Sequence, residues 1–261
     1  MKKIISQHKK TLYHYTTLEA AVKILSTQTL RFGRFKNMND IAESKREYLS
    51  NISPELIDKE CHNYQSLSLT VDSRNCKGFE IDSLWGYYAD KGNGVCLAFN
   101  KEKLISAFKN QTSFHRYSPI TYLPNFTNNV PLQVEKEENL HKDIIKNIKN
   151  IFFTKSKDWK HENEYRFLTY SHQRFTLDYS DSLLAIILCL PQIEEIKDSL
   201  EYKILSRISD TQILRYQVAL GNKELVDIKG NIVYPIMEKD YLIKGQECQM
   251  LRVVCGACSN M

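Results

Sequence analysis

The charged residues that could do chemistry are densest in residues 159–166, where Glu162, Glu164 and Arg166 recur at every second position. On a strand, whose side chains alternate between two faces, these three would project from one face. A carboxylate held there could fix a sugar hydroxyl or stabilise a developing oxocarbenium ion, as carboxylates do in glycosidic bond cleavage. A solvated, salt-bridged strand face fits the same alternation, so the pattern predicts a candidate carboxylate site and leaves its reaction open.

A histidine near the N-terminus occupies a second position suited to binding. Alternation puts Leu12, His14 and Thr16 on one strand face, and Thr16 with Glu19 has the spacing of a capping box that opens a helix. His14 would then lie beside the unpaired amides of a helix N-terminus, where it could bind a ligand hydroxyl or phosphate. A histidine satisfied within a half-buried strand is the alternative.

Two aromatic residues, Trp85 and Tyr88, lie three positions apart and share one face of a predicted short helix. Such a pair packs in a core or lines a pocket in which a heteroaromatic ring stacks. Both interpretations stay open from the sequence.

Several well-known signatures are absent. The sequence has no Gly-rich phosphate loop, no GxGxxG, no HExxH and no GxSxG. Cys255 and Cys258 have CxxC spacing with Cys248 upstream, but no second pair completes a four-ligand set. We therefore expect no metal, and reduced thiols rather than disulfides.

Composition excludes disordered, collagen-like and membrane-spanning classes. The chain has 261 residues, of which 42% are hydrophobic, and its longest apolar run, Leu183 to Leu190, is far below the roughly 18 residues of a membrane span. The first ten residues hold no apolar segment of signal-peptide length, which favours a cytoplasmic location. The net charge, 36 minus 31 or +5, permits a nucleic-acid partner without demanding one.

Strand-like and helix-like segments alternate irregularly, which favours an α+β fold with mixed or antiparallel sheets over a doubly wound parallel one. We expect a single domain over residues 1–261. The pattern around Leu140, Ile144, Ile148 and Ile151 predicts one long charged helix over Gln133 to Lys157. The clearest predicted strands are 11–15, 65–71, 95–99, 164–169 and 183–188.

Taken in order, these clusters resemble the bacterial domain-of-unknown-function family number 2971. The resemblance covers about residues 10–190 and leaves a C-terminal extension of about 191–261. It rests on these segments: Leu12-Tyr13-His14-Tyr15-Thr16, Met38-Asn39-Asp40 with Glu43, Ser66-Leu67-Ser68, Trp85 with Tyr88 and Ala89, residues 94–99, and Trp159, Glu162, Glu164, Tyr165 and Arg166.

The layout is also similar to that of ADP-ribosyltransferases and their RNA phosphotransferase relatives. This resemblance implies split sheets with flanking helices, NAD as substrate and a macromolecular acceptor, protein or nucleic acid, or water. It implies catalytic roles for His14, on the adenine-side ribose, and for Glu164, on the nicotinamide ribose. The other implied NAD contacts are Tyr15, Thr16, Trp85, Tyr88, Glu162 and Arg166, with loop contacts from Asn39 and Asp40.

By analogy, this resemblance implies a setting in toxin action, phage defence or stress response. The competing hypothesis is a non-enzymatic binding module for nucleic acid or protein. The two differ in one geometric respect, because only the enzyme needs His14 and Glu164 to converge on one cleft.

Overall fold

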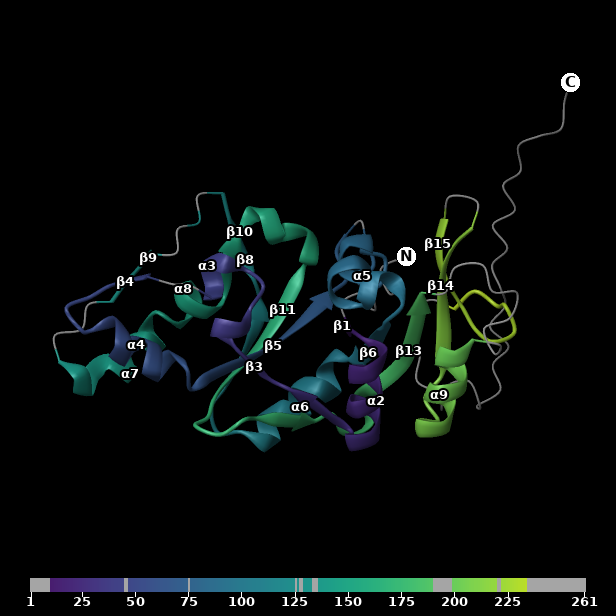
Figure 1. Ribbon diagram of the computed structural model, residues 1–261, viewed down its shortest axis with the longest axis horizontal. Coiled ribbons are helices and arrows are strands. Elements are labelled where there is room, and N and C mark those ends of the chain that lie inside the picture. The colour runs from purple at the N-terminus through teal and green to yellow at the C-terminus, as the bar shows by residue number, and fades with distance from the viewer. Residues whose placement is uncertain are drawn as a thin grey trace, which may run out of the picture.

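Helices and strands alternate along the chain (Figure 1), which confirms the predicted α+β class. The computed structural model describes residues 10–44, 47–74, 76–124, 126, 129–132, 136–189, 199–219 and 222–233. Cys248, Cys255 and Cys258 lie outside these residues. The cysteines that are described, Cys61, Cys76, Cys96 and Cys189, are free thiols.

A nine-stranded sheet forms the centre of the fold. Eight strands follow the order β15-β14-β13-β6-β1-β5-β11-β7, and β3 pairs with β5 beside this path. All neighbours are antiparallel except β13 and β14, so the sheet is mixed, as predicted. The strands are β1 (Thr11–Thr16), β3 (Gly33–Arg34), β5 (Tyr64–Val71), β6 (Val95–Asn100), β7 (His115–Pro119), β11 (Glu164–Tyr170), β13 (Leu183–Cys189), β14 (Ile213–Ala219) and β15 (Asn222–Val226).

Three two-stranded sheets surround the main one. Two are parallel pairs, β8 with β10 and β4 with β9, and the third is the antiparallel pair β2 with β12. Their strands are β2 (Thr29–Arg31), β4 (Glu47–Leu49), β8 (Thr121–Leu123), β9 (Asn129–Pro131), β10 (Thr154–Ser156) and β12 (Thr176–Asp178).

The main sheet splits between β1 and β5. The two strands pair only at Leu12 with Val71 and at Tyr13 with Thr70. Beyond that point β1 stays paired with β6 as far as Thr16, whereas β5 stays paired with β11. The strands therefore diverge from His14 onward, which confirms the predicted split and leaves a cleft in the middle of the sheet.

Helices cover both faces of the sheet. In Figure 1, α2, α6 and α9 lie on one face and α5 on the other. The helices are α2 (Leu18–Thr27), α3 (Ile41–Ser44), α4 (Pro54–Cys61), α5 (Asp82–Tyr88), α6 (Lys101–Gln111), α7 (Leu140–Lys146), α8 (Ile148–Phe152) and α9 (Leu200–Ile208). Short 3₁₀ turns are η1 (Phe35–Asn37), η2 (Asp90–Gly92), η3 (Glu137–Asn139), η4 (Lys157–Glu162) and η5 (Ser180–Ser182).

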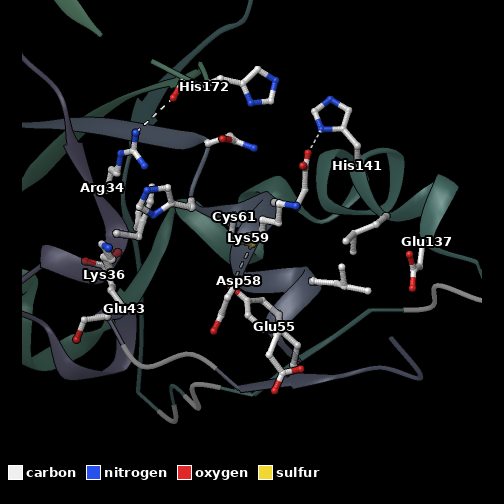
Figure 2. Close-up of a pocket in the computed structure, with 18 of the residues that line it drawn as sticks. Arg34, Lys36, Glu43, Glu55, Asp58, Lys59, Cys61, Glu137, His141 and His172 are labelled. Atoms are coloured by element: carbon white, nitrogen blue, oxygen red, sulfur yellow. Dashed lines mark hydrogen bonds and ion pairs between the residues drawn. The ribbon is translucent and has the colours of Figure 1, made fainter. Parts of the chain in front are cut away.

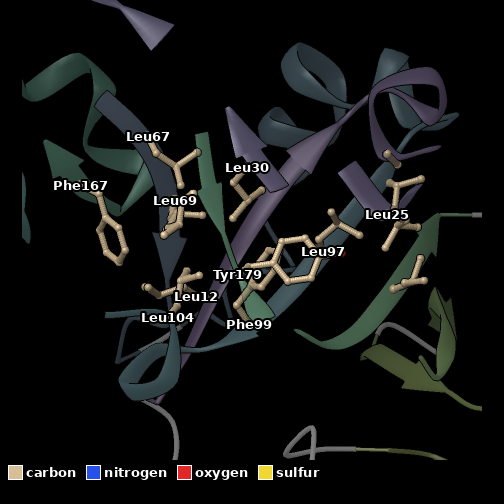
Figure 3. Packing of buried hydrophobic residues seen from close by; sticks show 14 of the residues in the cluster. Leu12, Leu25, Leu30, Leu67, Leu69, Leu97, Phe99, Leu104, Phe167 and Tyr179 are labelled. Carbon is tan, nitrogen blue, oxygen red and sulfur yellow. The ribbon is translucent and has the colours of Figure 1, made fainter. Parts of the chain in front are cut away.

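The alternation predicted for β1 is confirmed by the two cores. Leu12 packs under α2 and α6 in the cluster of Figure 3, whereas Tyr13 and Tyr15 pack on the α5 side. Each fully buried leucine of this kind contributes about 1.5–3 kcal/mol. The N-cap of α2 differs from the expectation: Thr17 accepts the amide of Ala20, and Thr16 stays in the strand.

The long helix predicted over residues 133–157 is wrong in its described part. The chain forms α7 and α8 with a break at Asn147, whose side chain donates to the Asp143 carbonyl and so competes with the helical backbone bonds. From Thr154 the chain is a strand that pairs with β8. The end of α8 at Phe152 has a consequence for the site, because it makes Lys155 a strand residue.

The close approach of Gly94 to the backbone generates a testable prediction. A Cβ at Gly94 would meet the Thr16 carbonyl and lie 2.7 Å from the Ala89 Cα, both of which are backbone. Gly94→Ala should therefore destabilise the fold by about 1–3 kcal/mol in urea unfolding. Gly86→Ala is the matched control, because nothing lies within 4 Å there and alanine favours a helix. Equal stability of the two variants would contradict the prediction.

Candidate functional site

A cavity of about 260 Å³ opens where β1 and β5 diverge. It brings together residues from β1, β5, α3, α5, β10, η4 and β11. The predicted site residues that line it are His14, Tyr15, Asn39, Asp40, Tyr88, Glu162 and Glu164. His14 and Glu164, which lie far apart in the sequence, therefore do converge on one cleft.

Arg166 on β11 organises the floor of the site. Its guanidinium is fully buried and donates from Nε and Nη2 to Glu164, at 2.6 and 3.0 Å. Its opposite edge donates from Nη1 and Nη2 to Glu43 on α3, and Nη1 also donates to the Phe152 carbonyl at 2.7 Å. All five N–H groups of an arginine can be matched by these five bonds. Arg166 thus holds Glu164 from below and does not itself line the cavity.

Lys155 on β10 connects all three buried carboxylates. Its Nζ lies 2.8 Å from Glu162, 2.9 Å from Glu164 and 3.5 Å from Glu43. Burial alone would lower the pKa of this ammonium, but Glu164 and Glu43 outweigh burial and raise the pKa. Lys155 therefore stays charged, and it faces the cavity.

The buried cluster carries a net negative charge. Counted formally, Glu43, Glu162 and Glu164 contribute three negative charges and Lys155 with Arg166 two positive ones, which leaves a formal net charge of −1. Burial by itself would raise the pKa of Glu164, but the charges of Arg166 and Lys155 lower the pKa from 4.5 to about 2. A carboxylate in this state is ionised throughout the neutral range, and buried charge acts strongly because little solvent screens it.

Tyr88 closes one side of the site. Its hydroxyl donates to Glu162 at 2.8 Å and also bonds the side chain of Asn39. Burial and the nearby Glu162 carboxylate raise the pKa of Tyr88, so the phenol stays protonated and keeps donating. The chain from Asn39 through Tyr88 to Glu162 joins α5, on the β1 side of the split, to η4 on the β11 side.

His14 is half-buried on β1 and faces the split. Burial lowers the pKa of its imidazole, and a hydrogen bond to the backbone of Ser68 on β5 partly opposes this. The ring is therefore neutral at pH 7 and bridges the diverging strands. A neutral imidazole fixed in this way can bind a hydroxyl without adding positive charge to the site.

Besides Arg166, two other residues predicted to contact NAD do not line the cavity. Trp85 is buried in the α5 core, where its ring stacks on Tyr216 at 5.8 Å and its Nε1 donates to the Phe79 carbonyl. Trp85 therefore takes the core role, since its ring and its polar atom already have partners. Thr16 is buried at the end of β1, opposite Val95, and is also absent from the cavity lining.

The lining residues to which the sequence reasoning gave no role include three buried polar ones, Lys155, Glu43 and Ser66. Ser66 is buried, and its hydroxyl has no hydrogen-bond partner among the described residues. The alternation of residues 65–71 could have indicated Ser66, because it places the side chains of Ser66 and Ser68 on the strand face opposite to that of Leu67. Lys155 left no such signal, because its partners come from distant segments.

A larger cavity of about 890 Å³ also borders Glu43 (Figure 2). It is lined by charged residues of both signs, including Arg34, Lys36 and Glu137, and by His141. Apart from Glu43, it shares no described lining residue with the cavity at the split.

Neither a metal-binding group nor a membrane-spanning helix is present in the described residues. In this part of the chain no three His, Cys, Asp or Glu side chains are grouped so that they could hold a metal ion. Within the same residues, no helix combines the length and the apolar character needed to cross a bilayer.

The fold and site define an α+β protein with a split sheet and a buried acidic cluster at the split. A family model described as "Protein of unknown function (DUF2971)" matches residues 84–167, which confirms the predicted resemblance over the stretch from α5 to β11. No curated protein matches the chain.

Solved structures of DarT from Thermus sp. 2.9 are similar to this chain. The complex with NAD+ is 13% identical and covers 79% of this chain and 95% of its own, with a TM-score of 0.36. The carba-NAD+ complex is 14% identical and covers 80% and 94%, with a TM-score of 0.36. The complex with ADP-ribosylated ssDNA is 14% identical and covers 78% and 93%, with a TM-score of 0.34.

The five bonds of Arg166 generate a stability prediction. Arg166→Lys keeps the positive charge but offers three N–H donors in place of five, so at least two of the five bonds to Glu43, Glu164 and the Phe152 carbonyl are lost. Because buried acceptors are then left unsatisfied, the free energy of unfolding should fall by about 1–3 kcal/mol. Urea unfolding measures the loss. Arg174→Lys, at an exposed position, is the control and should change stability by less than about 0.5 kcal/mol. A tolerated Arg166→Lys would contradict the role of the guanidinium.

The lowered pKa of Glu164 predicts how stability changes with pH. The folded value, about 2, lies below the ordinary 4.5, so ionised Glu164 stabilises the fold above pH 5 and this contribution is lost as pH falls toward 2. The contribution at pH 7 is on the order of 3 kcal/mol. The unfolding free energy of Glu164→Gln should fall less steeply between pH 5 and 3 than that of the original chain. Glu102→Gln, exposed on α6, should keep the original slope, and a Glu164→Gln slope equal to it would refute the assignment.

Proposed function

We propose that this chain binds NAD at the split and transfers ADP-ribose to a macromolecular acceptor or to water. One observation carries the proposal: His14 and Glu164 line one cavity whose buried charged cluster has a net charge of −1. A binding module would have no need to hold an uncompensated negative charge in this place, because burying charge is costly.

The carboxylates keep capacity to accept hydrogen bonds from a ligand. An ionised carboxylate has about four acceptor positions. Glu162 uses two of them, for Tyr88 and Lys155, and Glu164 uses three, for Arg166 twice and Lys155 once. The remaining positions suit hydroxyls of the nicotinamide ribose, and the unpartnered Ser66 hydroxyl offers a further contact.

The reaction that fits this site breaks the bond between the ribose C1′ and the nicotinamide nitrogen. Nicotinamide leaves with the bonding electron pair, and positive charge develops on the ribose as an oxocarbenium ion. The net negative cluster stabilises that charge without needing to reorganise, because its members are already held in place. An acceptor nucleophile then bonds C1′ and gives its proton to solvent.

The size of the cavity limits what enters it. Pockets that enclose a whole drug-sized ligand measure about 300–1,000 Å³, whereas this cavity measures about 260 Å³. The nicotinamide and its ribose would therefore lie inside, beside Glu162 and Glu164. The rest of the dinucleotide would cross the mouth toward His14, whose neutral ring suits a ribose hydroxyl.

Release of nicotinamide from NAD tests the proposal. The purified chain should release nicotinamide, faster when an oligonucleotide or cell lysate supplies an acceptor. Glu164→Gln should lower kcat by roughly 10²-fold or more, as loss of one charge-stabilising group does, and His14→Ala should mainly raise KM. Because Glu164 is ionised down to about pH 2, the rate should show no acidic limb from Glu164 between pH 5 and 8.

Matched controls separate chemistry from folding. Glu102→Gln and His172→Ala change exposed residues of the same two types outside the cavity and should keep the original rate. Thermal unfolding of each variant shows whether it is folded at the assay temperature. No release and no NAD binding by the original chain would overturn the proposal, and salt-dependent oligonucleotide binding would then favour the binding module.

A further inference from the structure

Glu43 is buried beneath the site, although it comes from the short helix α3 and not from the sheet. Its carboxylate is fully enclosed and bonds two cations, Arg166 and Lys155. The segment that carries it is fixed by Asp40, whose side chain accepts the Ala42 amide and whose carbonyl accepts the amides of Glu43 and Ser44. Asp40 thus caps the turn that delivers Glu43.

Glu43 occupies the edge of the guanidinium that Glu164 does not use. Arg166 points Nε and Nη2 toward Glu164, and Nη1 and Nη2 toward Glu43. With a carboxylate on each edge, the planar guanidinium has one orientation in which all donors are satisfied. Glu43 also draws on the ammonium of Lys155, which otherwise contacts only Glu162 and Glu164 among the buried carboxylates.

We propose that Glu43 is a positioning residue of the site: through Arg166 and Lys155 it fixes where the Glu164 and Glu162 carboxylates lie, and it contributes one of the three formal negative charges of the cluster. This inference rests on the proposed function for its kinetic consequence. Its structural consequence, the placement of Glu164 and Lys155, holds whatever the substrate is.

Replacing Glu43 by glutamine changes two things at constant size. The amide NH₂ would face N–H donors of Arg166 or Lys155, so one bond is lost and the two cations move toward the remaining carboxylates. The cluster charge changes from −1 to 0, which weakens stabilisation of the oxocarbenium ion. The loss of charge acts on the transition state, whereas displaced carboxylates also bind the ribose less well, so kcat should fall by a larger factor than KM for NAD rises.

The experiment compares Glu43→Gln, Glu43→Asp and the control Glu137→Gln, an exposed carboxylate on η3 that lines the larger cavity. We expect a fall in kcat of roughly 10²-fold for Glu43→Gln. Glu43→Asp keeps the charge and should retain more of kcat than Glu43→Gln does. This variant keeps the inference testable if Glu43→Gln impairs folding. Glu137→Gln should behave like the original chain. An original kcat in Glu43→Gln, or equal losses in the glutamine and aspartate variants, would overturn the inference.

A crystal structure of Glu43→Gln separates this inference from the proposed function. If the original chain releases no nicotinamide, the proposed function fails, and the crystal structure alone decides the role of Glu43. Displacement of the Glu164 carboxylate and the Lys155 ammonium from their present contacts would support positioning. The same contacts at unchanged distances would overturn it.

Discussion

The fully buried guanidinium of Arg166 is the constraint on which the rest of the site depends. A buried arginine is tolerated only when its donors are matched, because an uncompensated buried charge costs several kcal/mol. Matching them requires a carboxylate two residues along the same strand, the Phe152 carbonyl at the end of α8, and Glu43 from α3. The end of α8 at Phe152 follows the same logic, since a helix that continued to residue 157 would leave the Phe152 carbonyl to its own backbone.

The cluster also explains why the sheet can split without collapsing. Where β1 and β5 part, backbone pairing is replaced by side-chain bonds: His14 reaches the Ser68 backbone, and Tyr88 reaches Glu162 from the opposite half. These two bonds cross the cleft at different positions. The cavity is thus built into the sheet: the diverging strands form its sides, and the ion pairs around Arg166 form its floor.

Much of this could be predicted, for reasons that differ between residues. Strand 164–169 and the shared face of Glu164 with Arg166 follow from alternation, and both side chains do bond each other. The expectation that Glu162 also lies on this strand is wrong: Glu162 ends the 3₁₀ turn η4, and Asn163, which separates it from β11, adopts a left-handed conformation with φ of 45°. Lys155 could not be found: helical spacing of apolar residues ran on toward it, and the three carboxylates that bury it are assembled by the tertiary fold.

The roles of the two aromatic residues on α5 could not be predicted from the sequence. Trp85 and Tyr88 share a helix and a spacing, yet Trp85 stacks on Tyr216 from a distant strand while Tyr88 reaches the acidic cluster. The local sequence does not distinguish an aromatic ring that packs in a core from one that faces a cavity, because the difference depends on which distant residue the ring contacts. The cluster of ion pairs shows the same dependence on partners. On the Arg166 side every donor is matched, whereas on the cavity side Glu162 and Ser66 keep unused hydrogen-bonding capacity, and this is the capacity that the proposed NAD site would use.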